Sequence, residues 1–184
     1  MIPGVRGRLL AASFIRDVLP TMAGVGELPR DVARDLARWS ARIESTLGAA
    51  SSVRAIADVA IVPLLDLLGL TVARRADAGD ACWIQLAAGS RSSSIAIVTP
   101  WGARLEGVWR SAVVEAIGAD ARWSFCSNGL VLRLGDARRT WSRHYLEFDL
   151  QALGRDAEAQ SVLWAVARGG AMASEPPLLD RAVG

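Results

Sequence analysis

Apolar residues recur every three or four positions early in the chain, which is the period of an amphipathic helix. The clearest such stripe follows Pro29 and ends before Gly48, a residue type that stops helices. Its members are Val32, Leu36, Trp39, Ile43 and Leu47. A shorter helix is expected over residues 8–19, where Pro20 closes it.

A second long helical stretch follows the first. Ser51 or Ser52 is suited to cap its start, Pro63 predicts a kink or restart inside it, and Gly69 ends it. Together these patterns predict that residues 1–69 form a helical segment packed on the rest of the protein.

Beyond Gly69 the pattern changes to short runs with the composition of β-strands. Runs at 70–74, 82–87 and 94–99 are separated by the turn-like sequences DAGD and AGSRS. A helix is then expected to end at Gly118, which is a candidate C-cap. Its apolar face consists of Leu105, Val108, Trp109, Ala112, Val113, Ala116 and Ile117.

The Asn128-Gly129 pair separates two alternating apolar runs, at 122–126 and 130–134. Asn-Gly between such runs is the strongest short signal for a β-hairpin. A last strand at 145–150 and a last helix at 155–167 follow, and residues 169–184 have the composition of a tail or linker.

These elements predict an α/β (α+β) fold, in which the helical segment 1–69 precedes a mixed sheet flanked by helices over residues 70–168. Two cysteines, Cys82 and Cys126, lie inside apolar runs and are expected to be buried free thiols. The longest apolar run, 55–70, carries Asp58 and Asp66, so no membrane span is expected. We expect a cytoplasmic protein.

The basic residues limit the chemistry that is open to this chain. All of them are arginines, which excludes a P-loop lysine and a Schiff-base lysine, and the net charge is only +2. The single histidine, His144, excludes multi-histidine metal sites, and no GxSxG motif is present for a serine nucleophile.

The best candidate for nucleic-acid binding is the stretch after the predicted hairpin, where arginines alternate with an aromatic residue. Guanidinium groups bind phosphates bidentately, and an aromatic ring can stack on a base. The candidates are Arg138, Arg139, Arg143 and Trp141, with Arg91 in a separate serine-rich turn. The alternative is that these arginines are solvated or paired with the nearby acids Asp136, Glu147 and Asp149.

Three consecutive strands, one helix and a strand that ends in an Asn-Gly turn are the layout of the restriction-endonuclease-like nuclease core. Two stretches sharpen this likeness: LGAASSVRAIADVAIVPLLDLLGL at 47–70, and TPWGARLEGVWRSAV at 99–113 followed by WSFCSNGLVLRLGDARRTWSRHYLEFDL at 123–150. Over about residues 38–167 the chain resembles the N-terminal region of type IIG restriction-modification proteins.

In those proteins an endonuclease-like module precedes a DNA adenine methyltransferase, so the resemblance implies DNA and a methyltransferase domain or chain as partners. This chain has no NPPY motif and no glycine-rich turn after a strand. S-adenosylmethionine is therefore expected only for a methyltransferase part that lies outside this sequence.

Active members of the superfamily hold Mg²⁺ between an acid at the start of the second core strand and an acid-x-lysine at the end of the third. Asp80 matches the first position, whereas the third strand ends in Ile97, Val98 and Thr99, without acid or lysine. The resemblance thus implies a degenerate core without nuclease activity or metal.

Glu106 and Glu115, on the following helix, are the candidate substitute ligands, and Mg²⁺ is expected only if they complete an active site with Asp80. Three hypotheses follow. The leading one is a non-catalytic domain that positions DNA or braces a methyltransferase in a restriction-modification or phage-defence protein. The others are a purely structural protein-interaction module and an active Mg²⁺-dependent endonuclease.

Overall fold

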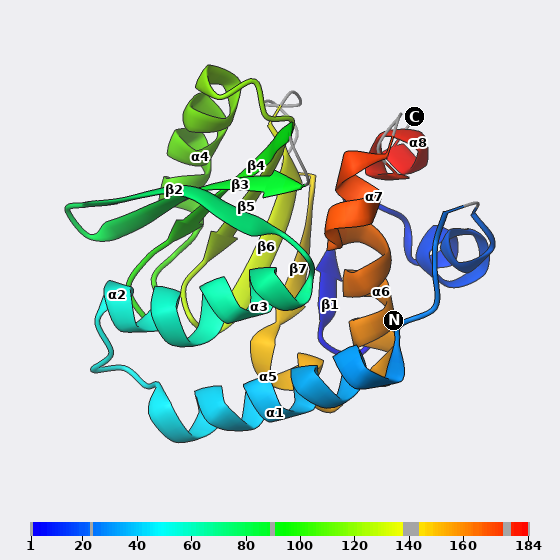
Figure 1. The fold of residues 1–184 in the computed structure, drawn as a ribbon, viewed down its shortest axis with the longest axis horizontal. Coiled ribbons are helices and arrows are strands. Elements are labelled where there is room, and N and C mark those ends of the chain that lie inside the picture. Colours follow the sequence, from blue (N-terminus) through cyan, green and yellow to red (C-terminus); the bar gives the residue numbers. More distant parts are fainter. Residues whose placement is uncertain (1, 23, 89–90, 138–143, 175–177, 184) are drawn as a thin grey trace.

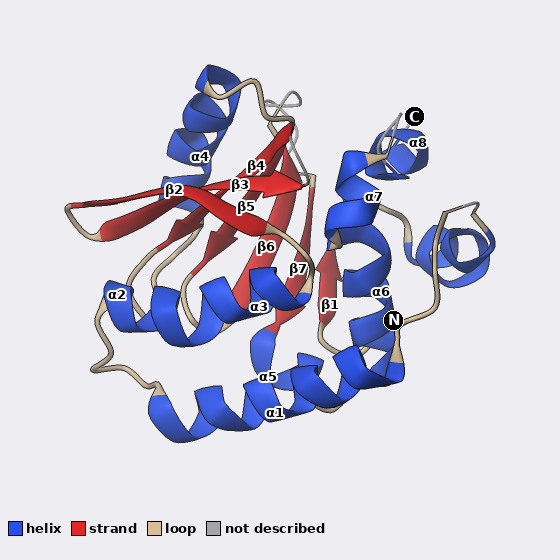
Figure 2. Cartoon of the chain, viewed as in Figure 1, coloured by secondary structure: helices blue, strands red, loops and turns tan. Residues whose placement is uncertain are grey.

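A seven-stranded, mostly antiparallel sheet runs through the described part of the molecule (Figures 1 and 2). The computed structural model describes residues 2–22, 24–88, 91–137, 144–174 and 178–183. The strand order is β1-β7-β6-β5-β4-β3-β2, and only β4 and β5 pair in parallel. The strands are β1 Val5–Gly7, β2 Thr71–Ala78, β3 Ala81–Ala88, β4 Arg91–Val98, β5 Trp123–Ser127, β6 Val131–Asp136 and β7 Tyr145–Asp149.

Helices lie on both faces of this sheet, and α4 stands apart from the others (Figure 2). The N-terminal helices are η1 Phe14–Val18, η2 Leu19–Thr21, α1 Arg30–Thr46, α2 Val53–Ile56, η3 Ala57–Ile61 and α3 Val62–Leu67. The later helices are α4 Glu106–Gly118, α5 Leu150–Leu153, α6 Ala157–Ala167, α7 Gly169–Ala173 and α8 Leu178–Val183. No described helix combines the length and the apolarity needed to cross a bilayer.

The amphipathic stripe of α1 packs as its spacing predicts. Leu36, Trp39 and Ile43 are buried, and the indole N–H of Trp39 donates to the carbonyl oxygen of Ala60 at 2.8 Å. This bond ties α1 to η3. The predicted cap of the next helix is also present, since the Ser52 hydroxyl accepts from the N–H of Ala55 at 3.1 Å.

The predicted kink at Pro63 takes the form of a π-turn. The N–H of Val62 bonds to the carbonyl of Ala57, five residues back, and the chain then continues as α3. Proline has no N–H to donate and its ring crowds the preceding turn, so a wider turn just before it keeps the helix continuous.

The hairpin at Asn128 is confirmed, and its side chain fixes the turn. The Asn128 Oδ1 accepts from the N–H groups of Leu130 and Val131, both at 3.0 Å. Its Nδ2 donates to the carbonyl oxygen of Ala103 at 2.8 Å, which fastens the turn to the loop before α4. Gly129 has a φ of +83°, a conformation that favours glycine.

Two N-terminal expectations need correction. Residues 5–7 form β1, which pairs with β7 and places Val5 opposite Phe148. The helix predicted over 8–19 is shorter, because its main described part is η1 at Phe14–Val18. A three-residue strand contains too few alternations to be recognised from its pattern.

The end of α4 also differs from the prediction. Gly118 lies inside the helix, and the left-handed residue is Asp120, with a φ of +51°. Aspartate tolerates this conformation better than most residue types, because its short polar side chain is able to hydrogen-bond locally. Ile117, predicted to face the core, is 57% exposed.

The segment after Ala167 is largely helical where the structure describes it. α7 and α8 occupy most of it, although its composition is typical of a linker. Leu178 and Leu179 are buried in the same hydrophobic cluster as Leu36 and Phe148. The helical segment 1–69 contributes to that cluster too, so both ends of the chain pack on the sheet.

The two faces of the sheet carry separate hydrophobic clusters. The larger cluster joins the N-terminal and C-terminal helices to one face, through side chains such as Leu86, Phe125 and Phe148. The smaller one joins α4 to Ile95, Ile97 and Cys126 on the other face. Among the described elements, α4 contacts chiefly β4 and β5, and its Trp109 and Glu106 side chains reach over β6.

Candidate functional site

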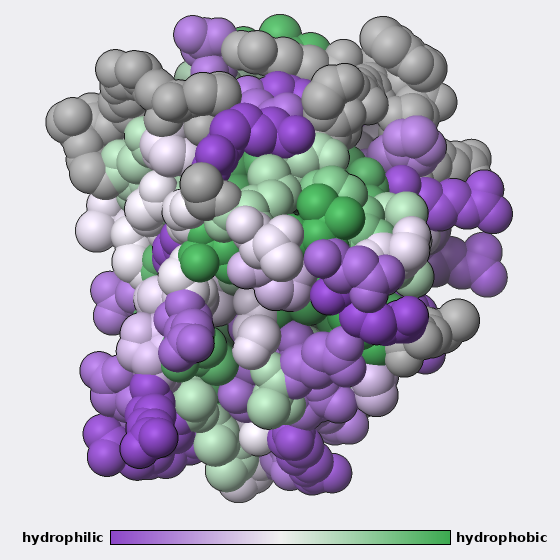
Figure 3. Space-filling view, turned by 90° about the vertical axis from the view of Figure 1, so that its right-hand side faces the viewer, coloured by the Kyte–Doolittle hydropathy of each residue, from purple (hydrophilic) through white to green (hydrophobic). Residues whose placement is uncertain are grey.

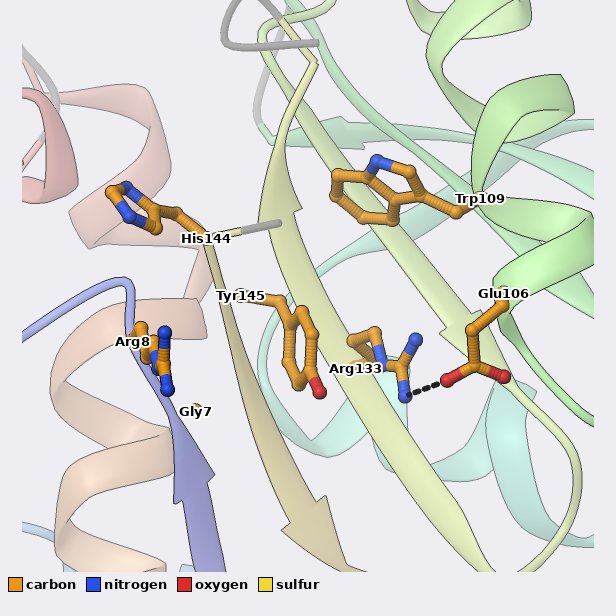
Figure 4. A pocket seen from close by; sticks show the side chains of 7 residues that line it. All are labelled: Gly7, Arg8, Glu106, Trp109, Arg133, His144 and Tyr145. Carbon is orange, nitrogen blue, oxygen red and sulfur yellow. Dashed lines mark hydrogen bonds and ion pairs between the residues drawn. The ribbon is translucent and has the colours of Figure 1, made fainter. Parts of the chain in front are cut away.

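A cavity of about 540 Å³ lies beside α4, over the part of the sheet that this helix does not cover. A volume of this size is typical of small-molecule sites. Strands β1, β6 and β7 and helix α4 contribute to its walls (Figure 4). The lining residues are Gly7, Arg8, Glu106, Trp109, Arg133, His144 and Tyr145.

Glycines shape this cavity. The indole of Trp109 lies directly over the backbone of Gly135, where an added Cβ would come within 1.8 Å of its ring. Gly7 has a φ of +119°, and a Cβ there would approach the carbonyl oxygen of Tyr145 to 1.9 Å. Neither position has room for a side chain, so both glycines are structural requirements of the site.

Arg133 is held rigidly at the floor of the cavity and is only 7% exposed. Its Nε and Nη2 donate to Oε2 of Glu147 at 3.1 and 2.8 Å, and its guanidinium lies 4.0 Å from the centre of the Tyr145 ring. Burial acts to lower the pKa of Arg133, but the hydrogen bond and charge of Glu147 outweigh burial and raise it. Arg133 therefore remains a fixed, largely neutralised cation.

Glu106 reaches into the same cavity from the first turn of α4. Its Oε1 lies 3.4 Å from Nη2 of Arg133 (Figure 4). The pKa of Glu106 is lowered, first by a hydrogen bond from its own backbone N–H and then by the charge of Arg133, despite some desolvation. The side chain is 59% exposed, so its oxygens remain open to a ligand as hydrogen-bond acceptors.

Arg8 and His144 line the opposite side of the cavity (Figure 4). Arg8 follows β1, and the N–H groups of Arg8 and Leu9 both donate to the carbonyl oxygen of Tyr145, at 3.0 and 3.2 Å. Arg8 is exposed and has no ion-pair partner within the described residues. One wall is thus basic, while the wall from α4 is aromatic and acidic.

The three acids considered for a metal site do not form a cluster. Asp80 is exposed in the turn between β2 and β3, and Glu115 is exposed on α4, whereas Glu106 lines the cavity. In the part of the chain that is described, no three His, Cys, Asp or Glu side chains are grouped as a metal site would require. These residues do not fit Mg²⁺.

The end of the third core strand offers no replacement ligand. Cys82 pairs with Val98, so the start of β3 and the end of β4 do lie side by side, at the same end of the strands. Thr99 follows β4, and both its N–H and its hydroxyl donate to the carbonyl oxygen of Ser127, at 2.8 and 3.2 Å. The Thr99 hydroxyl thus fastens the end of β4 to β5.

The nucleic-acid candidates Arg138, Arg139, Trp141 and Arg143 lie outside the described residues, as does the side chain of Arg91. The strand ends that flank the first four are described. Asp136 pairs with Trp123 at the start of β5, and β4 begins at the same end of the strands. Asp80 lies at the opposite end of the strands, about 26 Å away along the eight residues of β3.

The three acids that were alternative partners for these arginines each bind another described group. Asp136 accepts hydrogen bonds from Arg122 at 2.9 and 3.1 Å. Glu147 binds Arg133, and Asp149 caps α5 by accepting from the N–H groups of two residues in its first turn. Arg122 also pairs with Asp180 of α8 at 2.6 Å, which fastens the C-terminal helix to the sheet.

The cavity itself was not predicted from the sequence. In the sequence, Trp109 lies on the predicted apolar face of a helix, which indicates a core residue. Arg8 and Tyr145 belong to no recognisable motif. The one available signal is Arg133, a charged residue in the otherwise apolar alternation of LVLRLG. No family model, curated protein or solved structure matches the chain.

Proposed function

We propose that this chain is a non-catalytic, restriction-endonuclease-like domain that contacts DNA as part of a restriction-modification or phage-defence methyltransferase protein. The observation that carries the proposal is the order of its elements. Strands β2, β3 and β4 form an antiparallel meander, α4 crosses over, and β5 returns parallel to β4 before the Asn128 hairpin. This is the layout that the resemblance implies.

The surroundings of Asp80 support a domain without nuclease activity. Asp80 is exposed at a hairpin turn, and the neighbouring end of β4 offers Ile97, Val98 and a hydrogen-bonded Thr99. A metal ion bound between Asp80 and the end of β4 would lack a second carboxylate ligand. The attacking water would lack a lysine to position it. Mg²⁺ is required only by the alternative of an active endonuclease, and S-adenosylmethionine only by a methyltransferase part outside this chain.

The arginines between β6 and β7 support a contact with DNA. Arg138, Arg139 and Arg143 follow Asp136 in the sequence, and Asp136 itself ends β6 near the start of β5. Arginine forks bind phosphate oxygens without reading sequence. Because the net charge is only +2, we expect weak binding that is lost as salt rises.

A plasmid assay tests the catalytic part of the proposal. With Mg²⁺ or Mn²⁺ present, supercoiled DNA is expected to stay intact at protein concentrations that shift a duplex in a low-salt gel. Metal-dependent nicking that disappears in Asp80→Ala would overturn the proposal in favour of an active endonuclease.

A second candidate, a protein-interaction module that braces a methyltransferase, is favoured by a largely apolar cavity of about 530 Å³. The cavity lies between η1, the start of α1 and α6, with Ile15, Leu19 and Val162 among its lining residues. Figure 3 shows the side of the molecule where η1 and α8 lie, with hydrophobic surface gathered between polar residues. This candidate is preferred if replacing Arg138, Arg139 and Arg143 together by alanine leaves the low-salt DNA shift unchanged.

A further inference from the structure

The cavity beside α4 has two chemically different ends. Arg8 and His144 form one end, and Trp109 and Glu106 form the other (Figure 4). Arg133 lies between them, but Glu147 already binds two of its nitrogens. The cation of the cavity that remains without a described partner is therefore Arg8, at the end away from Glu106.

A ligand that suits both ends must carry an anion at one side and hydrogen-bond donors on a flat ring at the other. Guanidinium groups bind phosphate more strongly than neutral donors do. An indole ring stacks on aromatic heterocycles, and a carboxylate accepts N–H bonds from base edges. At about 540 Å³ the cavity is large enough for one nucleotide and too small for a duplex.

We propose that this cavity binds a single nucleotide unit, with its phosphate at Arg8 and His144 and an amino-bearing base between Trp109 and Glu106. Guanine is the preferred base, because its N1–H and N2–H₂ groups lie side by side and match the two oxygens of a carboxylate. Thymine presents no amino group to Glu106. The residues that carry this proposal are Arg8, His144, Trp109 and Glu106, so it is argued independently of the proposed DNA contact.

The side chains around the cavity hold one another in place. Tyr145 supports the Arg133 guanidinium, Glu147 anchors it, and Arg133 in turn lies 3.4 Å from Glu106. The Trp109 ring is fixed over Gly135. A site whose side chains are held in place loses little conformational entropy when a ligand binds.

Calorimetric titration of the full chain with 2′-deoxyguanosine 5′-monophosphate tests the proposal. Binding is expected, with deoxyguanosine and inorganic phosphate each about tenfold weaker because each lacks one half of the contacts. Arg8→Ala is expected to weaken the monophosphate about tenfold and to leave deoxyguanosine unchanged. Arg110→Ala, an exposed arginine of α4 that does not line the cavity, is the matched control and should change nothing.

Base preference is tested with Glu106→Gln. Wild-type protein is expected to bind the guanosine monophosphate several-fold more tightly than thymidine 5′-monophosphate, and the variant to lose most of that difference. The proposal is overturned if the guanosine monophosphate shows no binding at millimolar concentration, or if its affinity is the same in wild type, Arg8→Ala and Glu106→Gln.

A further titration distinguishes a free nucleotide from an unpaired nucleotide of DNA. The probes are a blunt duplex and the same duplex with one unpaired 3′ guanine. Tighter binding of the second duplex, reversed by added monophosphate, assigns the cavity to DNA ends or extruded bases. Equal binding of the two duplexes beside tight monophosphate binding assigns it to the free nucleotide.

Discussion

The two faces of the sheet are covered very differently. Helices from both ends of the chain pack on one face and enclose a large apolar cluster, whereas α4 is the only described helix that packs on the other, over β4 and β5. Strand β6 shows the contrast within a few residues. Leu132 and Leu134 are fully buried in the large cluster, while Arg133 lines the cavity beside α4 and Gly135 lies under the Trp109 ring.

The unequal covering of the two faces indicates which face is suited to carry a binding site. On the thickly covered face, packing decides which residue occupies each position, and aliphatic and aromatic side chains fill it. On the face covered by α4, strands β6 and β7 instead carry the largely buried Arg133–Glu147 ion pair and a stacked tyrosine. Such polar groups are costly to bury and serve best where a ligand can approach.

The largest loss of stability is expected on the face that is covered by helices from both ends of the chain. Phe148 is fully buried between the sheet and the helices, so Phe148→Ala should lower the free energy of unfolding by about 3–5 kcal/mol. Urea denaturation followed by tryptophan fluorescence measures this loss. A loss below about 1 kcal/mol would contradict a single core shared by both ends of the chain.

A smaller loss of stability is expected from Gly135→Ala, on the face that α4 covers. The new Cβ collides with the Trp109 ring, which must shift at a cost of about 1–3 kcal/mol and reshape the cavity. Gly118→Ala in α4 is the matched control, because nothing lies near its added methyl group and the helix should gain about 0.5–1 kcal/mol. Thermal unfolding distinguishes the two, and equal melting temperatures would contradict the placement of Trp109.

Each face holds one buried thiol, and the two differ in their response to pH. Burial raises the pKa of Cys126 on the α4 side to about 12, and burial together with a hydrogen bond to Asp77 raises that of Cys82 to about 11. The folded state keeps both protons while the unfolded chain releases them above about 8.5. The stabilisation is therefore complete below that pH and is lost as pH rises toward the folded values.

Cys126→Ala is expected to remove part of this pH dependence. The wild type should lose about 1.4 kcal/mol per thiol for each pH unit in that window. Denaturation at pH 8 and pH 10 measures the difference, and Cys82→Ala is the comparison from the other face. Identical pH dependence in wild type and both variants would contradict the burial of the thiols.

The smallest effect is expected at Ile117, on the outer side of α4. Its side chain is 57% exposed, so Ile117→Gln should change stability by less than about 0.5 kcal/mol. Val113→Gln, one turn earlier and buried, is the contrasting substitution and should destabilise the protein clearly. If both cost the same, the orientation of α4 in the structure is wrong.

Much of the fold was predictable because its elements are long enough to show their period. The α1 stripe, the Ser52 cap, the three-strand meander and the Asn128 hairpin each carry a local signal, and each is present. What was missed has a physical reason. Residues 5–7 form too short a strand, and β2 is a largely exposed edge strand whose polar second half shows no alternation.

The candidate site was less predictable, because it forms from residues that are distant in the sequence. Arg8, Trp109 and Tyr145 come together only when β1 pairs with β7 and α4 packs on the sheet. Leu178 and Leu179 are a similar case, since a linker-like composition does not reveal that α8 packs against Arg122 and Trp123. Local patterns contain no information on such contacts.

The salt dependence of binding tests whether the arginines between β6 and β7 contact DNA, as we propose. Fluorescence anisotropy with a labelled duplex gives the slope of log K against log salt, which falls by about 0.9 for each phosphate contact. Replacing Arg138, Arg139 and Arg143 by alanine is expected to reduce the slope of the wild type by about 2–3 and to abolish binding at moderate salt. An unchanged slope would contradict the claim.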